Sequence, residues 1–176
     1  MGSRSFHGVV LSKAEPLHQM IEAWFDGSCL PVNPGGTARV GAVIYQDHRR
    51  IAQISKIIGH GEGMSNNVGE CAAVTFVLEY LISKNLQNEP IRIYGDSLLV
   101  INSINHLKPL RGLCHDSSVK AVSLSSKFTN AEFIWIPREQ NVEADRLSNP
   151  FSEQVRVRRS TSRQKDRQPL IGNATS

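Results

Sequence analysis

Four carboxylates in this 176-residue chain stand where metal-ion chemistry would require them. Asp26 lies in an apolar, strand-like segment, Glu70 near the start of a predicted helix, Asp96 directly after a predicted strand, and Asp145 on the last predicted helix. Carboxylates that come close together repel one another unless protons or cations compensate their charge. Oxygen ligands suit Mg²⁺ or Mn²⁺. Two such ions about 3.5–4 Å apart can activate a water for in-line displacement at a phosphate.

Each carboxylate also has an ordinary structural interpretation. Asp96 could cap a helix that begins at Ser97, and Glu70 could favour the dipole of its own helix. Asp145 could be a solvated helix position. Asp26 is the hardest to explain in this way, because a carboxylate in an apolar strand needs a partner. The four positions therefore indicate a site jointly rather than singly.

The elements that would position these residues follow from hydrophobic periodicity, which predicts the order β-β-β-α-β-α-α-β-α. Strands are predicted over 21–29, 40–45, 51–58, 91–95 and 132–136, and helices over 66–83, 97–106, 116–128 and 139–147. We expect an α/β fold with a mixed five-stranded sheet, three antiparallel strands followed by parallel ones, flanked by helices. Residues 30–37 are dense in turn formers, and Gly59, Gly61 and Gly63 are interpreted as a flexible connector rather than a phosphate loop.

Composition indicates one ordinary globular domain over 19–150, after an irregular lead-in over 1–18. Residues 154–176 carry six basic side chains and one acid, whereas residues 1–153 carry 14 basic and 15 acidic ones. The segment 151–176 is therefore predicted to be a basic, disordered tail. With no secretory signal and no membrane span in the sequence, we expect a cytoplasmic protein. Cys29, Cys71 and Cys114 form no zinc motif and are predicted to be free thiols, although one disulfide stays open.

The sequence resembles the ribonuclease H family, and in particular its short type 1 branch, over about residues 21–149. The matching segments are FDGS at 25–28, NPGG at 33–36, GA at 41–42, NNVGECAA at 66–73, IYGDS at 93–97 and WIPREQNVEADRL at 135–147. The resemblance implies the ribonuclease H-like fold and an endonuclease that cuts the RNA strand of RNA–DNA hybrids with two Mg²⁺ or Mn²⁺ ions, leaving 5′-phosphates. Double-stranded RNA is a second candidate substrate, no membrane partner is implied, and a monomer is expected.

The resemblance also implies roles for single residues. Asp26, Glu70, Asp96 and Asp145 would be the catalytic metal ligands, with Asp26 bridging both ions. Asn33, Asn66 and Asn67, with backbone groups around Gly35, would line the minor groove of the hybrid, where the 2′-hydroxyl distinguishes RNA from DNA. Ser97 and Asn141 would be further substrate-binding residues.

Two departures from the longer members of the family change these expectations. Longer members carry a histidine before the last aspartate, and residues 135–145 contain none. Arg138 is the candidate for that catalytic role, with a phosphate contact or a salt bridge to Glu139 or Glu143 as its alternative, and His115 is a weaker candidate. The segment 107–114 is also too short for the basic handle of some relatives. The tail could supply that grip in a salt-dependent way, or could simply be solvated.

Three rival interpretations stay open at the level of sequence. Another nuclease of the same fold, resembling a transposase or junction resolvase, would share acidic residues on related strands. A nucleic-acid-binding module without catalysis is disfavoured because all four carboxylates are present. A structural scaffold would leave the acidic residues unexplained.

Overall fold

The computed structural model describes residues 20–149, which form one mixed five-stranded sheet. Its strands are β1 (Ile21–Leu30), β2 (Gly35–Gln46), β3 (Arg49–Gly61), β4 (Ile91–Gly95) and β5 (Ala131–Trp135). The spatial order is β3-β2-β1-β4-β5. The pairs β1–β2 and β2–β3 are antiparallel, whereas β1–β4 and β4–β5 are parallel. The predicted fold class is confirmed.

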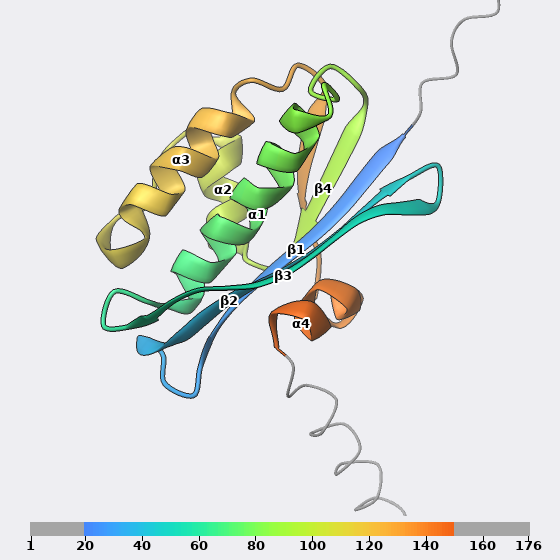
Figure 1. The fold of residues 1–176 in the computed structure, drawn as a ribbon. Helices are drawn as coiled ribbons and strands as arrows, with labels where there is room; N and C mark the ends of the chain where they lie inside the picture. The colour runs from blue at the N-terminus through green and yellow to red at the C-terminus, as the bar shows by residue number, and fades with distance from the viewer. Residues whose placement is uncertain (1–19, 150–176) are drawn as a thin grey trace, which may run out of the picture.

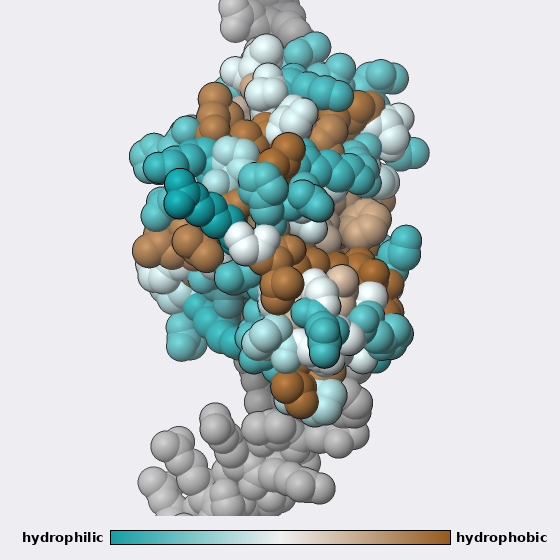
Figure 2. All heavy atoms as spheres, turned by 90° about the vertical axis from the view of Figure 1, so that its left-hand side faces the viewer, coloured by the Kyte–Doolittle hydropathy of each residue, from teal (hydrophilic) through white to brown (hydrophobic). Residues whose placement is uncertain are grey.

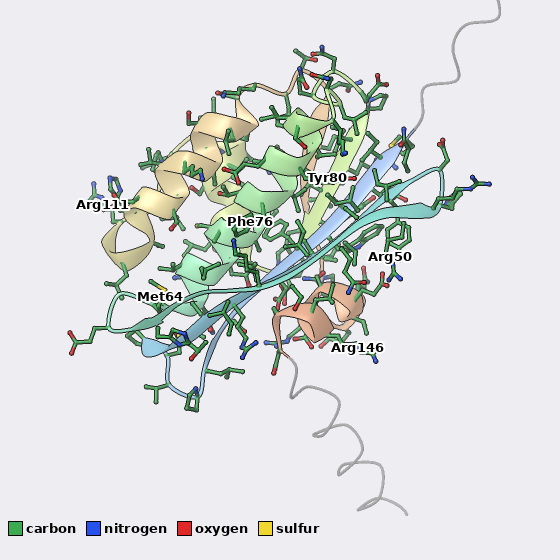
Figure 3. All side chains as sticks on the ribbon, viewed as in Figure 1. Arg50, Met64, Phe76, Tyr80, Arg111 and Arg146 are labelled. Atoms are coloured by element: carbon green, nitrogen blue, oxygen red, sulfur yellow. The ribbon has the colours of Figure 1, made fainter. Side chains whose placement is uncertain are left out.

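Helices cover the two faces of the sheet unequally. Three of them, α1 (Asn66–Ser83), α2 (Leu98–Asn105) and α3 (His115–Ser125), lie on one side, and the short α4 (Val142–Ser148) packs on the other (Figure 1). Single 3₁₀ turns at Gly112–Cys114 and Arg138–Gln140 precede α3 and α4. Figure 3 shows the same division, with Arg146 on α4 directed away from the sheet and Phe76 and Tyr80 on α1 at the opposite face.

Alternation along β1 decides which side chains face the three-helix layer. Ile21, Ala23 and Phe25 are fully buried and join the core that α1 covers with residues such as Leu78. Trp24 and Asp26 alternate with these residues along the strand, so they belong to the face on which α4 packs. The same alternation that builds the core thus sends Asp26 toward the short last helix.

Three element predictions were wrong in detail. Gly59 and Gly61 belong to β3 instead of forming a connector: Gly59 pairs with Ala38, and Gly61 pairs with Gly35 at a φ of 91°. Strand β2 accordingly starts at Gly35, inside the segment predicted as turn. The last helix is interrupted at Asn141, which separates the 3₁₀ turn from α4. Long-range pairing and packing decided each of these boundaries against local propensity.

Other expectations concern cysteines, membranes and the chain ends. Cys29, Cys71 and Cys114 are free and buried, as predicted. Among residues 20–149, no helix is both long and apolar enough to cross a bilayer. The predicted lead-in (1–18) and basic tail (151–176) lie outside the described residues. On the face that carries α3, exposed apolar side chains lie in small groups between polar ones (Figure 2).

Helix α4 lies against β2 because the strand has a glycine at the contact. A side chain at Gly41 would meet backbone atoms of Ala144, Leu147 and Ser148. Gly41 also pairs with Asp26 across β1 and β2. The missing side chain therefore allows α4 to approach the strand position that carries this carboxylate.

We predict that Gly41→Ala lowers the free energy of unfolding by about 1–3 kcal/mol, the usual effect of overpacking a close contact. Denaturant unfolding measures this quantity. The matched control is Gly63→Ala, since an added Cβ there meets nothing within 4 Å. The control should stay within about 0.5 kcal/mol of wild type. Equal effects of both substitutions would show that the approach of α4 is not tight.

Candidate active site

The parallel pairing of β1 and β4 places Asp26 and Asp96 beside each other. The register runs from Ile21 opposite Ile91 to Phe25 opposite Gly95, where the pairing ends. Asp26 and Asp96 are the next residues on the two strands, so they emerge at the same end of the sheet. The alternative that Asp96 caps α2 is wrong, because Ser97 occupies the N-cap position.

The N-terminal part of α1 brings Glu70 to this end of the sheet. Ser65 caps the helix by accepting a hydrogen bond from the backbone N–H of Val68. A side chain at Gly27, directly after Asp26, would overlap the backbone of Gly69 and Glu70. One carboxylate oxygen each from Asp26, Glu70 and Asp96 can be chosen so that all lie within 4.8 Å of one another. These three predicted ligands therefore converge, and we call them the acidic cluster.

The acidic cluster is poorly solvated for so much negative charge. Asp26 is only 3% exposed. Its pKa is raised from 3.8 to about 7, mainly by burial and also by the nearby charges of Asp96 and Asp145, while a hydrogen bond from Ser148 acts in the opposite direction. Burial likewise raises the pKa of Glu70 well above its usual range, with contributions from Asp26 and Asp96. The ionised cluster thus lacks compensating charge.

A divalent cation fits what these residues lack. Glu70 Oε2 is buried and has no hydrogen-bond partner, and a buried acceptor without a partner is costly. Carboxylate oxygens are the donor set that Mg²⁺ and Mn²⁺ prefer. Asp26, Glu70 and Asp96 are accordingly the residues that could hold such an ion.

Asp145 has a different environment from the other three carboxylates. It is buried on α4, and its Oδ1 accepts a hydrogen bond of 2.5 Å from Nη2 of Arg138, whose side chain is 67% exposed. It does not belong to the group of oxygens within 4.8 Å. Arg138 therefore forms an ion pair, but with Asp145 rather than with Glu139 or Glu143, the partners that the sequence suggested. His115 forms a hydrogen bond of 2.8 Å between its Nδ1 and the backbone oxygen of Leu110.

The ends of α4 hold two further side chains against the strands. Asn141 is fully buried, and its Nδ2 donates to the backbone oxygen of Phe25 at 2.8 Å and to Asp96 Oδ1 at 3.1 Å. Predicted as a substrate contact, Asn141 instead lies behind the acidic cluster. Ser148, also fully buried, donates through Oγ to Asp26 Oδ2. Ser148 was not predicted as a site residue; its position three residues after Asp145 places it on the same helix face as that carboxylate.

Four of the six predicted substrate-contact residues lie around the N-terminus of α1: Asn33, Gly35, Asn66 and Asn67. The side-chain oxygen of Asn33 accepts from the backbone N–H of Asn66 at 2.9 Å, and Asn66 Oδ1 accepts from the N–H of Cys29 at 2.6 Å. Gly35 donates its N–H to the oxygen of Met64. Asn33, Asn66 and Asn67 are exposed, and Ser97 is partly exposed after Asp96. The β1–β2 loop and α1 thus form one polar, accessible surface.

The sheet order and the acidic cluster define this protein as a ribonuclease H-like domain. The sequence profile of the reverse transcriptase-like family matches residues 24–150, and the chain belongs to that family.

Solved structures agree with this family. The N-terminal RNase H domain of rv2228c from Mycobacterium tuberculosis, solved as a fusion with maltose-binding protein, is 28% identical with a TM-score of 0.65, covering 74% of this chain and 97% of that one. RNase H1 from the halophilic archaeon Halobacterium salinarum is 27% identical with a TM-score of 0.63, covering 74% and 95%. LC11-RNase H1 was isolated from compost by a metagenomic approach, and one of its structures contains an RNA/DNA hybrid. That complex is 26% identical with a TM-score of 0.62, covering 72% and 92%.

The raised pKa of Asp26 predicts a stability difference that depends on pH. Between pH 3.8 and about 7 the folded protein holds a proton on Asp26 that the unfolded chain releases, so this group stabilises the fold less as pH rises. In a chelator, Asp26→Asn should therefore gain stability relative to wild type as pH increases through this window. Denaturant unfolding at a series of pH values measures the difference.

The matched control for this series is Asp47→Asn, in the exposed turn between β2 and β3. Its stability relative to wild type should stay nearly constant with pH. A constant difference for Asp26→Asn as well would contradict the assigned electrostatics.

Proposed function

We propose that this protein is an endonuclease that hydrolyses the RNA strand of RNA–DNA hybrids, leaving 5′-phosphates. The observation that carries the proposal is the approach of Asp26, Glu70 and Asp96 oxygens to within 4.8 Å at the end of the two central strands. Membership of the family supports it, as does the likeness to LC11-RNase H1, which was solved with an RNA/DNA hybrid.

Asp26, Glu70 and Asp96 would hold two Mg²⁺ or Mn²⁺ ions, with Asp26 shared between them and Asp145 as a fourth ligand. When bound, such ions lower the pKa of an attacking water and stabilise charge on the phosphate and leaving oxygens. The carboxylates of this chain orient the scissile phosphate by fixing where the ions lie. No nucleophilic side chain is required for this chemistry.

Selection of RNA would come from the polar surface around the start of α1. Asn33, Asn66 and Asn67, with the backbone near Gly35, can donate to and accept from a 2′-hydroxyl in the minor groove. Ser97 directly follows Asp96 in the sequence, so it would contact the same strand of the nucleic acid. Contacts to sugars and phosphates carry no base identity, so cleavage would be RNA-selective and tolerant of sequence.

Arg138 and Asn141 would have different roles from those of the metal ligands. Arg138 pairs with Asp145 and leaves most of its side chain exposed. It could therefore release Asp145 to the ions and contact a phosphate of the cut strand. Asn141, buried behind Asp96, would orient that carboxylate rather than touch the substrate. All of these residues come from one chain, so a monomer can supply the complete site.

The test is cleavage of matched RNA–DNA, RNA–RNA and DNA–DNA duplexes of one sequence, with Mg²⁺ or Mn²⁺ and with a chelator. We expect metal-dependent cutting of the RNA strand of the hybrid, and the RNA–RNA duplex determines whether double-stranded RNA is also a substrate. Asp96→Asn keeps the shape of the side chain but removes its charge, so cleavage should fall to background.

The control for this test is Asp116→Asn, an exposed carboxylate in the first turn of α3. It should cut the hybrid at the wild-type rate. Cleavage of DNA–DNA alone, or of branched DNA, would favour another nuclease of this fold. Hybrid binding without any cleavage would indicate a module that has lost catalysis.

A further inference from the structure

The last helix presents three polar side chains to the sheet in a single row. Asn141, Asp145 and Ser148 are spaced at i, i+4 and i+7, the spacing of one helix face. Asn141 and Ser148 are fully buried and Asp145 nearly so. Ala144, between them, is also fully buried against the strands. A row of polar groups in a buried contact is unusual, since apolar residues would pack there without a need for partners.

Ser148 has a specific partner in this contact. Its hydroxyl carries one proton, and the nearer of its two acceptors is Asp26 Oδ2, the other being the backbone oxygen of Asp145 at 3.1 Å. The backbone oxygen of Ser148 in turn accepts a hydrogen bond of 2.7 Å from Ser28 Oγ. Ser28 and Asp26 are both on β1, so two hydrogen bonds join this residue to the strand on either side of Gly27.

These two hydrogen bonds restrict Ser148 as well as Asp26. The bond from Ser28 fixes the backbone of Ser148, and the close approach at Gly41 keeps the helix against β2. A carboxylate that accepts from a fixed, buried donor loses rotational freedom, and the other oxygen of Asp26 takes no part in this hydrogen bond. Partners of metal ligands often orient the ligand in this manner.

We propose that Ser148 is a positioning residue that orients Asp26 for binding divalent cations. Helix α4 would then do more than carry Asp145: its last residue would set the orientation of a strand carboxylate proposed to hold the ions. This inference rests on the proposed function, because it assigns Ser148 to the same metal site. Asn141 gives the helix a comparable contact with Asp96 at its other end.

The experiment measures Mn²⁺ binding to the full chain by calorimetry, without nucleic acid, and then hybrid cleavage against Mn²⁺ concentration. Ser148→Ala should weaken Mn²⁺ binding by roughly tenfold or more, as loss of an outer-shell partner commonly does. The Mn²⁺ concentration for half-maximal cleavage should rise by the same factor. The KM for the hybrid at saturating Mn²⁺ should stay unchanged.

The matched control is Ser125→Ala. Ser125 is buried at the end of α3, and its hydroxyl donates only to the backbone oxygen of Val122, three residues earlier. It should bind Mn²⁺ as wild type does. A second pair, Ser148→Thr and Ser148→Val, compares side chains of one shape with and without the hydroxyl, so that any packing defect is common to both. Threonine should retain tighter Mn²⁺ binding than valine.

Two results would overturn the proposal while leaving the proposed function intact: Ser148→Ala binding Mn²⁺ as tightly as Ser125→Ala, or the threonine and valine variants binding equally. Failure of the proposed function has a separate signature. In that case the wild-type chain would neither bind Mn²⁺ nor cut the hybrid, and the role assigned to Ser148 would be lost with it.

Discussion

The burial of several carboxylates close together at the end of the two central strands is the constraint on which the rest of the site depends. Asp26 and Glu70 are buried, and their raised pKa values express how unfavourable their ionised forms are without a compensating cation. A fold that keeps them together must supply the missing stabilisation from elsewhere in the structure. Binding of divalent ions would convert the same arrangement from a cost to the fold into a source of stability.

The fold supplies this arrangement from three directions. Parallel pairing of β1 and β4 ends where Asp26 and Asp96 begin, so the sheet alone fixes two of the carboxylates. Helix α1 delivers Glu70 from one face because Gly27 leaves room for its backbone, and α4 approaches from the other face over Gly41. The glycines therefore matter as much as the acids, since they determine how closely the helices can reach the strand.

The sequence predicted the five-stranded sheet and the directions of its strands, because strand ends and helix starts follow from local periodicity. It also predicted that four carboxylates come together; Asp26, Glu70 and Asp96 do, whereas Asp145 lies outside that group. It did not predict the interruption at Asn141 or the extension of β3 through Gly59 and Gly61, since both depend on contacts made far along the chain. Ser148 was missed for the same reason. Its hydroxyl has an obvious local acceptor at i−3, and only the packing of α4 on β1 gives it Asp26 as a partner. Polar residues thus revealed their partners only in three dimensions.

The most direct test of the central claim is anomalous diffraction from crystals of the full chain soaked in Mn²⁺. We expect an anomalous peak within bonding distance of oxygens from Asp26, Glu70 and Asp96, with the Glu70 oxygen that now lacks a partner among its ligands. Manganese bound only at other surfaces, while these three carboxylates stay protonated or hydrogen-bonded to one another, would contradict the account.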